Sequence, residues 1–358
     1  MYKPEKPFTD IETQLTIMAE RNLGITNQNT TSSILEKYGY YKIVNGYGEP
    51  FEVNNANKKK YIDDASFQDI YFQFQLDRII SRTVIPEILA IEQKLKTAVS
   101  YVLAKNYGVF HQLTDYDLNL EKAVKIYPSN IDSTSYLSKQ NFNNNNGEYD
   151  SVIEVYNIIS EAKISPLSFY RDHRTHIPPW ILIEQVEFGK LNRLFNTMKP
   201  ADKLEVMNIF FAINHSIEIN DQLYSSFFEM LELVRLFRNS FAHNARFLSS
   251  KFQLKFAFKK VMNNLDSPSL LSNKDYKNGI GKGDFFSLLS IITLFSDSGQ
   301  SAEANLALYE KVINNAFEGI KNDSNFSDSV TPKQAFLTTS GLPADYISRL
   351  KYLSKQLF

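Results

Sequence analysis

The sequence predicts a mainly α-helical protein, and three observations support that fold class. Apolar residues recur three and four positions apart over most of the chain, which is the spacing of one face of a helix. Strand-like alternation of apolar and polar residues is scarce by comparison. Residues that cap or end helices stand at the borders of most of the periodic segments.

The N-terminal part of the chain, residues 1–64, is expected to form a helical segment of its own. A first helix is expected over 9–23, where Thr9 or Asp10 can cap its start. A second helix is expected over 30–41. The turn-rich stretch 45–64 that follows allows a short β-hairpin, which is the one β element that the pattern permits.

The central part, residues 65–265, is expected to be a helical domain with a polar insertion near 111–147. Its first helix spans 66–106, where Pro86 can kink it or divide it in two. The insertion ends in NFNNNNG, which is typical of a surface loop. After a connection broken by prolines, SFYRDHRTHIPPW, the helical pattern resumes. Further helices of this part are expected over 149–164, 179–198, 200–217, 220–246 and 248–264.

The last part, residues 266–358, is expected to be a helical C-terminal extension. It opens with a turn cluster and the loop SNKDYKNGIGKGD, and it carries no motif that indicates a function. Helices are expected over 284–296, 302–320 and 342–356.

Composition excludes several classes of site and partner. The 358-residue chain has no cysteine, which removes disulfides, thiolate zinc sites and cysteine nucleophiles from consideration. A net charge of −1 argues against a protein that coats nucleic acid by bulk charge. Neither a signal peptide nor a long apolar window is present, so a cytoplasmic protein without a membrane span is expected. We also expect no cofactor.

The expected helix 220–246 has two contrasting faces. Six apolar residues are spaced 4, 3, 4, 3 and 4 apart and form one stripe that should face the core. These residues are Leu223, Phe227, Met230, Val234, Phe237 and Phe241. The opposite face gathers polar and basic residues within an arc of about 140°. They are Arg235, Arg238, Asn239, His243 and Arg246, around the small Ala242.

This polar face favours binding of an anion. The nearest carboxylate, Glu232, should lie off to one side, so the repulsion between Arg235 and Arg238 is expected to be relieved by a ligand. Arginine offers a planar fork of donors that suits phosphate oxygens, and histidine can exchange protons near neutral pH.

A phosphodiester of RNA fits these side chains without a metal. His243 can take the proton of a ribose 2′-OH or protonate the 5′ leaving oxygen, and Arg238 can stabilise charge on phosphorus. Asn239 can orient the histidine or the phosphate. The structural alternative is a solvated or salt-bridged helix end. The spacing R-x4-H is weak evidence, since it recurs at Arg171 and His176 in the proline-broken connection.

The segment RNSFAHNARF resembles the R-N-x-x-x-H signature of HEPN-domain ribonucleases. Other blocks resemble the abortive-infection (Abi, AbiD/AbiF-like) family: KPFTDIETQLTIMAERNLGI, ILEKYGYYKIVNGYGEPF, LDRIISRTVIPEILAIEQKLKTAV and IPPWILIEQVEFGKLNRLF. The resemblance implies a HEPN-like helical bundle, antiphage defence by RNA cleavage, and a homodimer whose two motifs form one composite site. It also implies a small non-coding RNA or an antitoxin as a partner. It places Arg238, Asn239 and His243 in the active site.

The same resemblance draws attention to the last of these blocks. Trp180 is expected to be a packing anchor rather than a base-stacking platform. Glu184 can pair with an active-site arginine or with Lys190 or Arg193 on its own helix. Phe188 and Gly189 belong to the block without an assigned role.

Basic and aromatic residues elsewhere offer weaker candidates. Lys251 and Lys255 are expected to continue, with Lys259, as a basic RNA-binding stripe on the helix 248–264, alongside Arg235 and Arg246. The run 58–60 and the tyrosines near Gly39 can contact RNA, but a solvated turn and a packed turn are the simpler interpretations.

Two other functions remain open on the sequence. A non-catalytic protein could hold a small structured RNA with the same arginines while tolerating loss of His243. Transfer of a nucleotide group would need a separate nucleotidyltransferase, because this chain has no Gly-rich phosphate loop.

Overall fold

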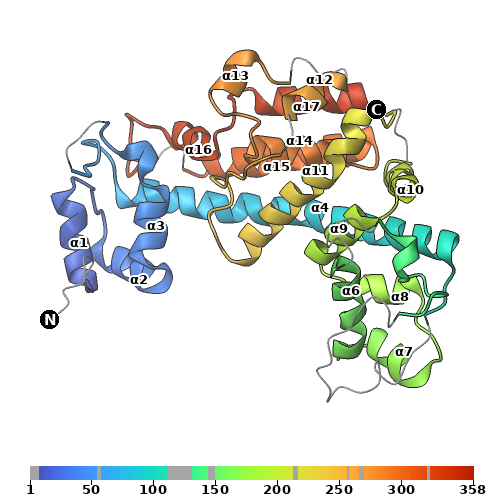
Figure 1. The fold of residues 1–358 in the computed structure, drawn as a ribbon. Coiled ribbons are helices and arrows are strands. Elements are labelled where there is room, and N and C mark those ends of the chain that lie inside the picture. The colour runs from blue at the N-terminus through green and yellow to red at the C-terminus, as the bar shows by residue number, and fades with distance from the viewer. Residues whose placement is uncertain are drawn as a thin grey trace.

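The protein is described by a computed structural model that covers residues 8–54, 58–111, 131–143, 150–212, 217–255, 258–265, 270–320 and 323–358. Within these ranges the chain is mainly helical, which confirms the expected fold class (Figure 1). The expected insertion 111–147 and His215 fall largely or wholly outside the described residues. None of the described helices is both long enough and apolar enough to cross a bilayer.

Three short helices form the N-terminal end of the molecule: α1 (Ile11–Glu20), α2 (Gln28–Tyr38) and α3 (Tyr40–Tyr47). The helix expected over 30–41 ends early because Gly39 takes a φ of 83°, which turns the chain between α2 and α3. A 3-10 turn, Glu49–Phe51, follows. The hairpin is reduced to an isolated antiparallel bridge between Glu52 and Tyr61.

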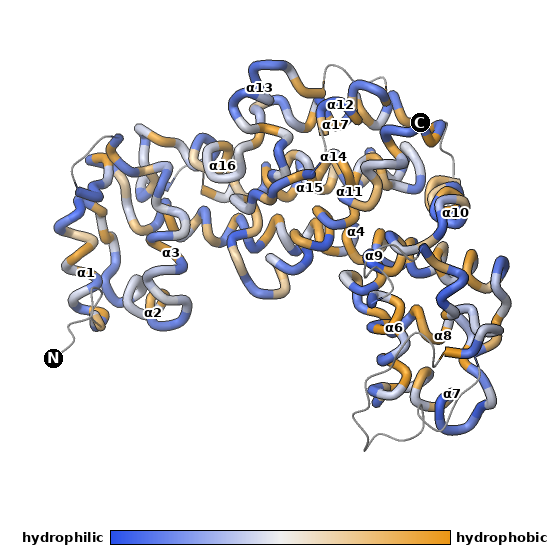
Figure 2. The backbone as a smooth tube through the Cα atoms, viewed as in Figure 1, coloured by the Kyte–Doolittle hydropathy of each residue, from blue (hydrophilic) through white to orange (hydrophobic). Residues whose placement is uncertain are grey.

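Helix α4 (Phe67–Tyr107) is the axis of the fold. It has 41 residues, so it extends about 60 Å at the rise of an α-helix. Ser66 and Asp69 form a capping box at its start. It continues as one helix through Pro86, so of the two possibilities left open there, a kink or a division, the division does not occur. Figure 1 shows α3 near one end of α4 and α8 near the other, and Figure 2 shows hydrophobic turns recurring along it.

The connection after the insertion is more helical than the prolines suggest. After the short 3-10 turn Lys139–Asn141 come α6 (Asp150–Glu161), α7 (Leu167–His173), α8 (Pro179–Glu184), α9 (Phe188–Thr197) and α10 (Pro200–Phe210). The single helix expected over 179–198 is thus two helices. The chain turns at Gln185 and Glu187, which buries Val186 completely.

The second half of the chain begins with α11 (Asp221–Ala242), which Asn220 caps through the amide of Leu223. The following helices are α12 (Phe258–Asn264), α13 (Asn273–Lys277), α14 (Phe285–Leu294), α15 (Gly299–Glu318), α16 (Pro332–Ser340) and α17 (Tyr346–Leu357). Helix α16 was not expected, although Thr331 and Gln334 form a capping box around Pro332 at its first position.

Two hydrophobic clusters hold these helices together. The larger one runs from Phe72 to Leu357, so it joins α4, α9 and α11 to helices near the C-terminus. All ten residues of α14 are buried in the structure. The smaller cluster joins α1, α2, α3 and the start of α4, and Ala335 of α16 contributes to it.

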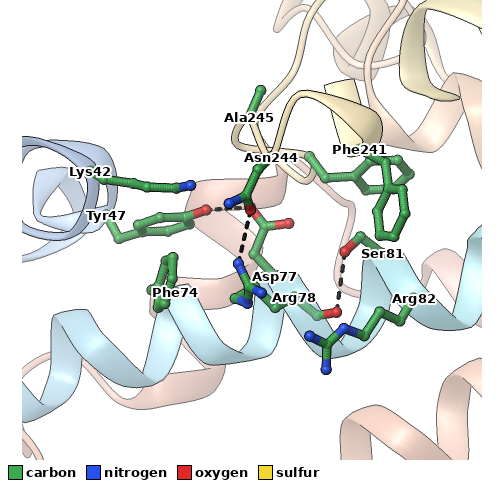
Figure 3. A pocket seen from close by; sticks show the side chains of 11 residues that line it. Lys42, Tyr47, Phe74, Asp77, Arg78, Ser81, Arg82, Phe241, Asn244 and Ala245 are labelled. Atoms are coloured by element: carbon green, nitrogen blue, oxygen red, sulfur yellow. Dashed lines mark hydrogen bonds between the residues drawn. The ribbon is translucent and has the colours of Figure 1, made fainter. Parts of the chain in front are cut away.

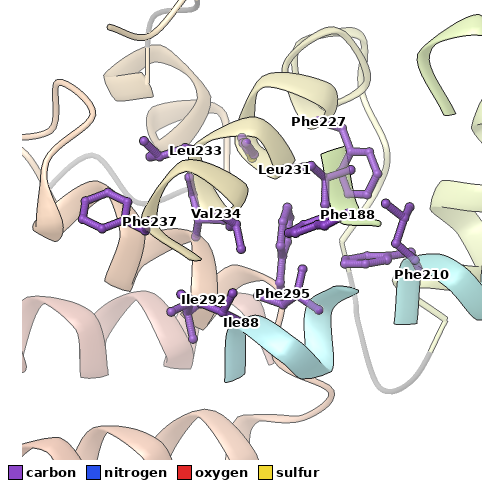
Figure 4. Close-up of a cluster of buried hydrophobic side chains, with 14 of the residues drawn as sticks. Ile88, Phe188, Phe210, Phe227, Leu231, Leu233, Val234, Phe237, Ile292 and Phe295 are labelled. Carbon is purple, nitrogen blue, oxygen red and sulfur yellow. The ribbon is translucent and has the colours of Figure 1, made fainter. Parts of the chain in front are cut away.

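The apolar stripe expected on α11 is confirmed. Its members from Leu223 to Phe237 are fully buried, whereas Phe241 is partly exposed at the end of the helix. Figure 4 shows Phe227, Val234 and Phe237 directed into the larger cluster. This stripe packs against α4, α9 and α14, and most residues on the opposite face of α11 are half-buried, with exposed positions near the two ends of the helix.

Candidate active site

His243 lies at the C-cap of α11, where the helix ends in a Schellman motif. Asn244 takes a left-handed φ of 54°. Its amide donates to the carbonyl of Phe241 at 2.9 Å, and the amide of Ala245 donates to the carbonyl of Ser240 at 2.8 Å. Because the backbone on both sides of His243 is hydrogen bonded, the Cα of this histidine has a fixed place at the helix end.

Arg238, Asn239 and His243 occupy the last turns of the solvent-facing side of α11. Arg238 and Asn239 are partly exposed, and Ala242 and His243 are exposed. Asn239 and His243 are one turn apart, and the amide of His243 still donates to the carbonyl of Asn239 at 2.9 Å. Among the described residues, no hydrogen bond or ion pair is formed by the side chain of Arg238 or of His243.

Arg235 departs from the expected arrangement because it has a carboxylate partner. Its Nε and Nη2 donate to both oxygens of Glu232 at 2.7–3.1 Å, so Glu232 does not lie off to one side. Asn192 of α9 donates to the same carboxylate. The Cδ of Arg235 lies 3.3 Å from where a Cβ on Gly189 would stand, which gives this glycine a packing role. The charge of Arg235 is therefore compensated within the chain.

Arg246 does not belong to the polar face of α11, because the helix has already ended at Ala242. The chain reverses at Asn244 and carries Arg246 toward α3, where its Nη1 donates to the carbonyl of Gly46 at 3.1 Å. The expectation that Arg246 shares one face with Arg238 is wrong for this reason.

Lys251 and Lys255 are not on a helix either. Residues 251–255 are not helical, and α12 begins only at Phe258. The backbone amide of Phe252 donates to the carbonyl of Gly283 at 2.9 Å. Phe252 and Leu254 are half-buried while Lys251, Gln253 and Lys255 are exposed, which is the alternation of an extended segment. The expected helical stripe of lysines is therefore wrong.

Sequence reasoning missed a group of residues on α3 and α4 that hold the end of α11. Nη1 of Arg78 donates to Oδ1 of Asn244 at 2.8 Å. The hydroxyl of Tyr47 donates to Asp77 at 2.6 Å, and the other oxygen of Asp77 accepts from the amide of Leu248 at 3.3 Å. Burial raises the pKa of Asp77 to about 6, against the opposing effect of these hydrogen bonds.

A cavity of about 200 Å³ opens between these elements (Figure 3). Its lining comes from α3, from one side of α4, and from the end of α11 with the turn that follows His243. The lining residues are Lys42, Tyr47, Phe74, Asp77, Arg78, Ser81, Arg82, Phe241, Asn244, Ala245 and Phe247. No single stretch of sequence reveals the cavity, because three separate segments form it.

In the second R-x4-H segment, the arginine, Arg171, has a structural role. Arg171 is buried and its Nη1 donates to the carbonyls of Ile159, Ser160 and Ala162, at the end of α6. An arginine that satisfies helix-end carbonyls is not free for a substrate. The copy at α11 is therefore the better candidate.

In the block around Trp180, the structure does not give Trp180 and Glu184 the roles expected of them. Trp180 is 51% exposed, so it is not the packing anchor that was expected. Glu184 pairs neither with an active-site arginine nor with Lys190 or Arg193. Instead its carboxylate accepts from Nε2 of Gln93 on α4 at 3.2 Å.

The two weaker candidates, the run 58–60 and the tyrosines near Gly39, form contacts within the chain. Lys59 forms an ion pair of 2.6 Å with Glu52 and lies over the ring of Tyr61. Near Gly39, Tyr38 packs against Phe74 and Tyr47 is buried, as a packed turn requires, whereas Tyr41 is 77% exposed.

Comparison with known proteins finds one family model that matches the chain. Residues 33–249 match the family model described as Abi-like protein, which is more than half of the 358-residue chain. The matched range includes α3, α4, α11 and the Schellman turn at His243. No curated protein and no solved structure matches the chain.

Proposed function

Because the chain belongs to the Abi-like protein family, we propose that it is an abortive-infection protein that acts as a metal-independent endoribonuclease of the HEPN type. The observation that carries this proposal is the last turn of α11. There Arg238, Asn239 and His243 share an exposed face, without side-chain partners for Arg238 and His243 among the described residues, on a backbone fixed by the Schellman motif. Such fixed placement is what a preorganised site needs.

The proposed reaction is an internal transfer at one phosphate of RNA. The ribose 2′-oxygen forms a bond to phosphorus while the bond from phosphorus to the 5′-oxygen of the next nucleotide breaks. The 2′-OH proton goes to a base, and the 5′-oxygen receives a proton from an acid. The products are a 2′,3′-cyclic phosphate and a 5′-OH end, so no water, metal or oxidant enters the balance.

His243 is the proton-transfer group in this proposal, and Arg238 stabilises the negative charge that develops on the phosphoryl oxygens. Asn239 lies one helical turn before His243 and can hold the imidazole or the phosphate in place. One chain supplies a single His243, whereas the reaction needs one base and one acid. Two copies in a homodimer would supply both, and the partly exposed end of α11 that carries Arg238, Asn239 and His243 is accessible to such a second copy.

The decisive experiment is cleavage of RNA by the purified protein in EDTA, followed by analysis of the ends. We expect cyclic phosphates, and His243→Ala should slow cleavage at least about 100-fold, since general acid–base catalysis contributes this much. His173→Ala is the matched control, because His173 is an exposed histidine stacked on Phe169 of α7. Undiminished cleavage by His243→Ala would exclude the proposal.

The competing function is a protein that grips a structured RNA without cutting it. It predicts RNA that co-purifies with unaltered ends and binding that survives His243→Ala but not Arg238→Ala. The two functions are therefore separated by the ends of the RNA and by the response to the histidine substitution.

The proposed dimer has a test of its own. Sedimentation should show two chains per particle. Mixing wild type with an excess of His243→Ala protein should lower the activity per wild-type chain, because mixed dimers then carry incomplete sites. Activity that is indifferent to mixing would count against a composite site.

A further inference from the structure

The cavity beside the candidate active site gathers positive charge from two elements. Arg78 and Arg82 are four residues apart on α4, so they project from one face of that helix. Lys42 reaches into the same space from α3, and Figure 3 shows it extending toward Asn244 while the arginines come from α4. Three cations thus line one cavity of about 200 Å³.

These cations lack acidic partners. Among the described residues, neither Lys42, Arg78 nor Arg82 forms an ion pair, and the hydrogen bond of Arg78 goes to the neutral amide of Asn244. Arg235, in contrast, is matched by Glu232 at 2.7 Å. Desolvation and then the charge of Arg78 lower the pKa of Lys42, which indicates that the positive charges in the cavity oppose one another.

The acidic residue in the lining, Asp77, is engaged with other partners. One oxygen of Asp77 accepts from the hydroxyl of Tyr47 and the other from the amide of Leu248. The carboxyl group is buried beneath the cavity, and among the described residues it forms no ion pair with Lys42, Arg78 or Arg82. An anion from outside the chain would relieve the repulsion.

The cavity begins one residue from His243. Asn244 and Ala245 line it, and consecutive Cα atoms are about 3.8 Å apart. Its volume lies below the roughly 300–1,000 Å³ of pockets that enclose drug-sized ligands. A phosphate group therefore fits this space better than a complete nucleotide does.

We infer that Lys42, Arg78 and Arg82 form a second phosphate site, which holds a backbone phosphate of the same single RNA strand next to the one at His243. The inference rests on the proposed function for its substrate class. The site has no part in the proton transfers. It fixes the register of the strand, since contacts to phosphates position a nucleic acid without reading its bases.

The test is binding of a fluorescent, fully 2′-O-methylated RNA oligonucleotide, measured by anisotropy over a range of salt concentrations. Methylation blocks the 2′-oxygen, so binding is measured without cleavage. Arg82→Gln and Lys42→Gln should each reduce the steepness of log affinity against log salt by about 0.7, the value for one phosphate contact to a single strand. At about 0.1 M salt this corresponds to about fivefold weaker binding than the wild type.

Arg174→Gln is the matched control, because Arg174 is an exposed arginine just after α7, at the far end of the molecule in Figure 1. We expect it to bind as the wild type does. Arg82 is chosen as the main variant because it is exposed and its removal should not affect folding, which a thermal melt verifies.

Unchanged salt dependence and affinity in both Arg82→Gln and Lys42→Gln would overturn the inference, whether or not the wild type cuts RNA. Displacement of the oligonucleotide by adenosine monophosphate at an equal phosphate concentration would also overturn it, because the cavity would then be a mononucleotide pocket. Failure of the proposed nuclease appears differently: the wild type leaves unmodified RNA intact while the binding differences persist.

Discussion

Asn244 determines where His243 stands, since it ends α11 in a left-handed conformation and accepts from Arg78. Asn244→Ala should lower the free energy of unfolding by about 1–2 kcal/mol, because alanine is strained at positive φ. Asn244→Gly should cost less, because glycine adopts that φ freely, although it also loses the bond to Arg78. Urea unfolding of both variants measures the difference. Equal losses would mean that the conformation of residue 244 is not what stabilises the turn.

Asp77 should make stability depend on pH. Its pKa is raised to about 6 in the folded protein by burial, whereas an unfolded aspartate titrates near 3.9. The folded state therefore binds the proton more tightly, and this group's contribution to stability falls as pH rises through that interval. Going from about pH 7 to about pH 5 should favour the folded state by about 1 kcal/mol through this group alone.

Asp77→Asn is the comparison that isolates this effect, since asparagine has nearly the same shape beside Tyr47 and Arg246 but does not titrate. Denaturant unfolding at both pH values should show a smaller change with pH for the variant than for the wild type. Parallel pH profiles would show that Asp77 is charged in the folded protein throughout the interval.

At the level of single residues, the sequence predicts more of the site's chemistry than of its geometry. Arg238, Asn239 and His243 share a face as helical arithmetic requires. Arg246 does not share this face, because α11 ends before the left-handed Asn244; asparagine is among the residues that commonly end a helix in this way. Lys42 and Arg82 could not be found, because they lie far from His243 in the sequence.

Among the elements, the extended segment 251–255 depends on one glycine. A Cβ on Gly283 would stand 1.8 Å from the carbonyl oxygen of Phe252, at a φ of +77°. Gly283→Ala should therefore cost at least about 3 kcal/mol of unfolding free energy, because backbone must move. Gly279→Ala is the control, since its φ is +90° but nothing lies within 4 Å of the added atom.

That control should lose about 1 kcal/mol, through conformation alone. Denaturant midpoints of the two variants give the comparison. If both lose the same amount, the contact between Gly283 and Phe252 does not hold the segment in place.

Helix α4 tolerates a proline at its centre, and this predicts a stabilising substitution. Pro86 is exposed and cannot donate to the carbonyl of Arg82, one turn earlier. Pro86→Ala should raise the free energy of unfolding by about 2 kcal/mol. This is the helix hydrogen bond and clash cost that alanine removes, less the stability that proline gives by restricting the unfolded chain. Leu89→Ala, at an exposed position one turn later, should change it little. A fall in the stability of Pro86→Ala would mean that the proline ring makes contacts of its own.

The elements that the sequence predicts well are those with both a period and a cap. Helix α11 starts at its Asn220 cap, and α4 starts at the capping box of Ser66. The segment KFQLK has the opposite signature, a period of two, and the helix expected over 248–264 does not form there. Helix α16 was missed despite its capping box, since few apolar residues follow Thr331.

At the scale of the whole molecule, the helices after residue 265 belong to the core that supports α11. Helix α14 is buried along its whole length and packs against α11. Asp64 accepts from the amides of Asp328 and Ser329, which ties the C-terminal part to the N-terminal one. A chain truncated after residue 265 should therefore fail to fold, as measured by circular dichroism and thermal unfolding. A cooperative melt of the truncated chain near the wild-type temperature would contradict this.

Within a single turn, helix α4 contributes side chains to both hydrophobic clusters: Phe72 packs in the larger one and Phe74 in the smaller one. Amide hydrogen exchange should reveal the consequence. Backbone amides on α1 and α3 should not open as an independent unit, because releasing them uncovers α4 and thereby loosens the larger cluster as well. Protection measured under native conditions should then decline together at both ends of α4 as denaturant is added, so the protein would behave as one cooperative unit despite its two cores.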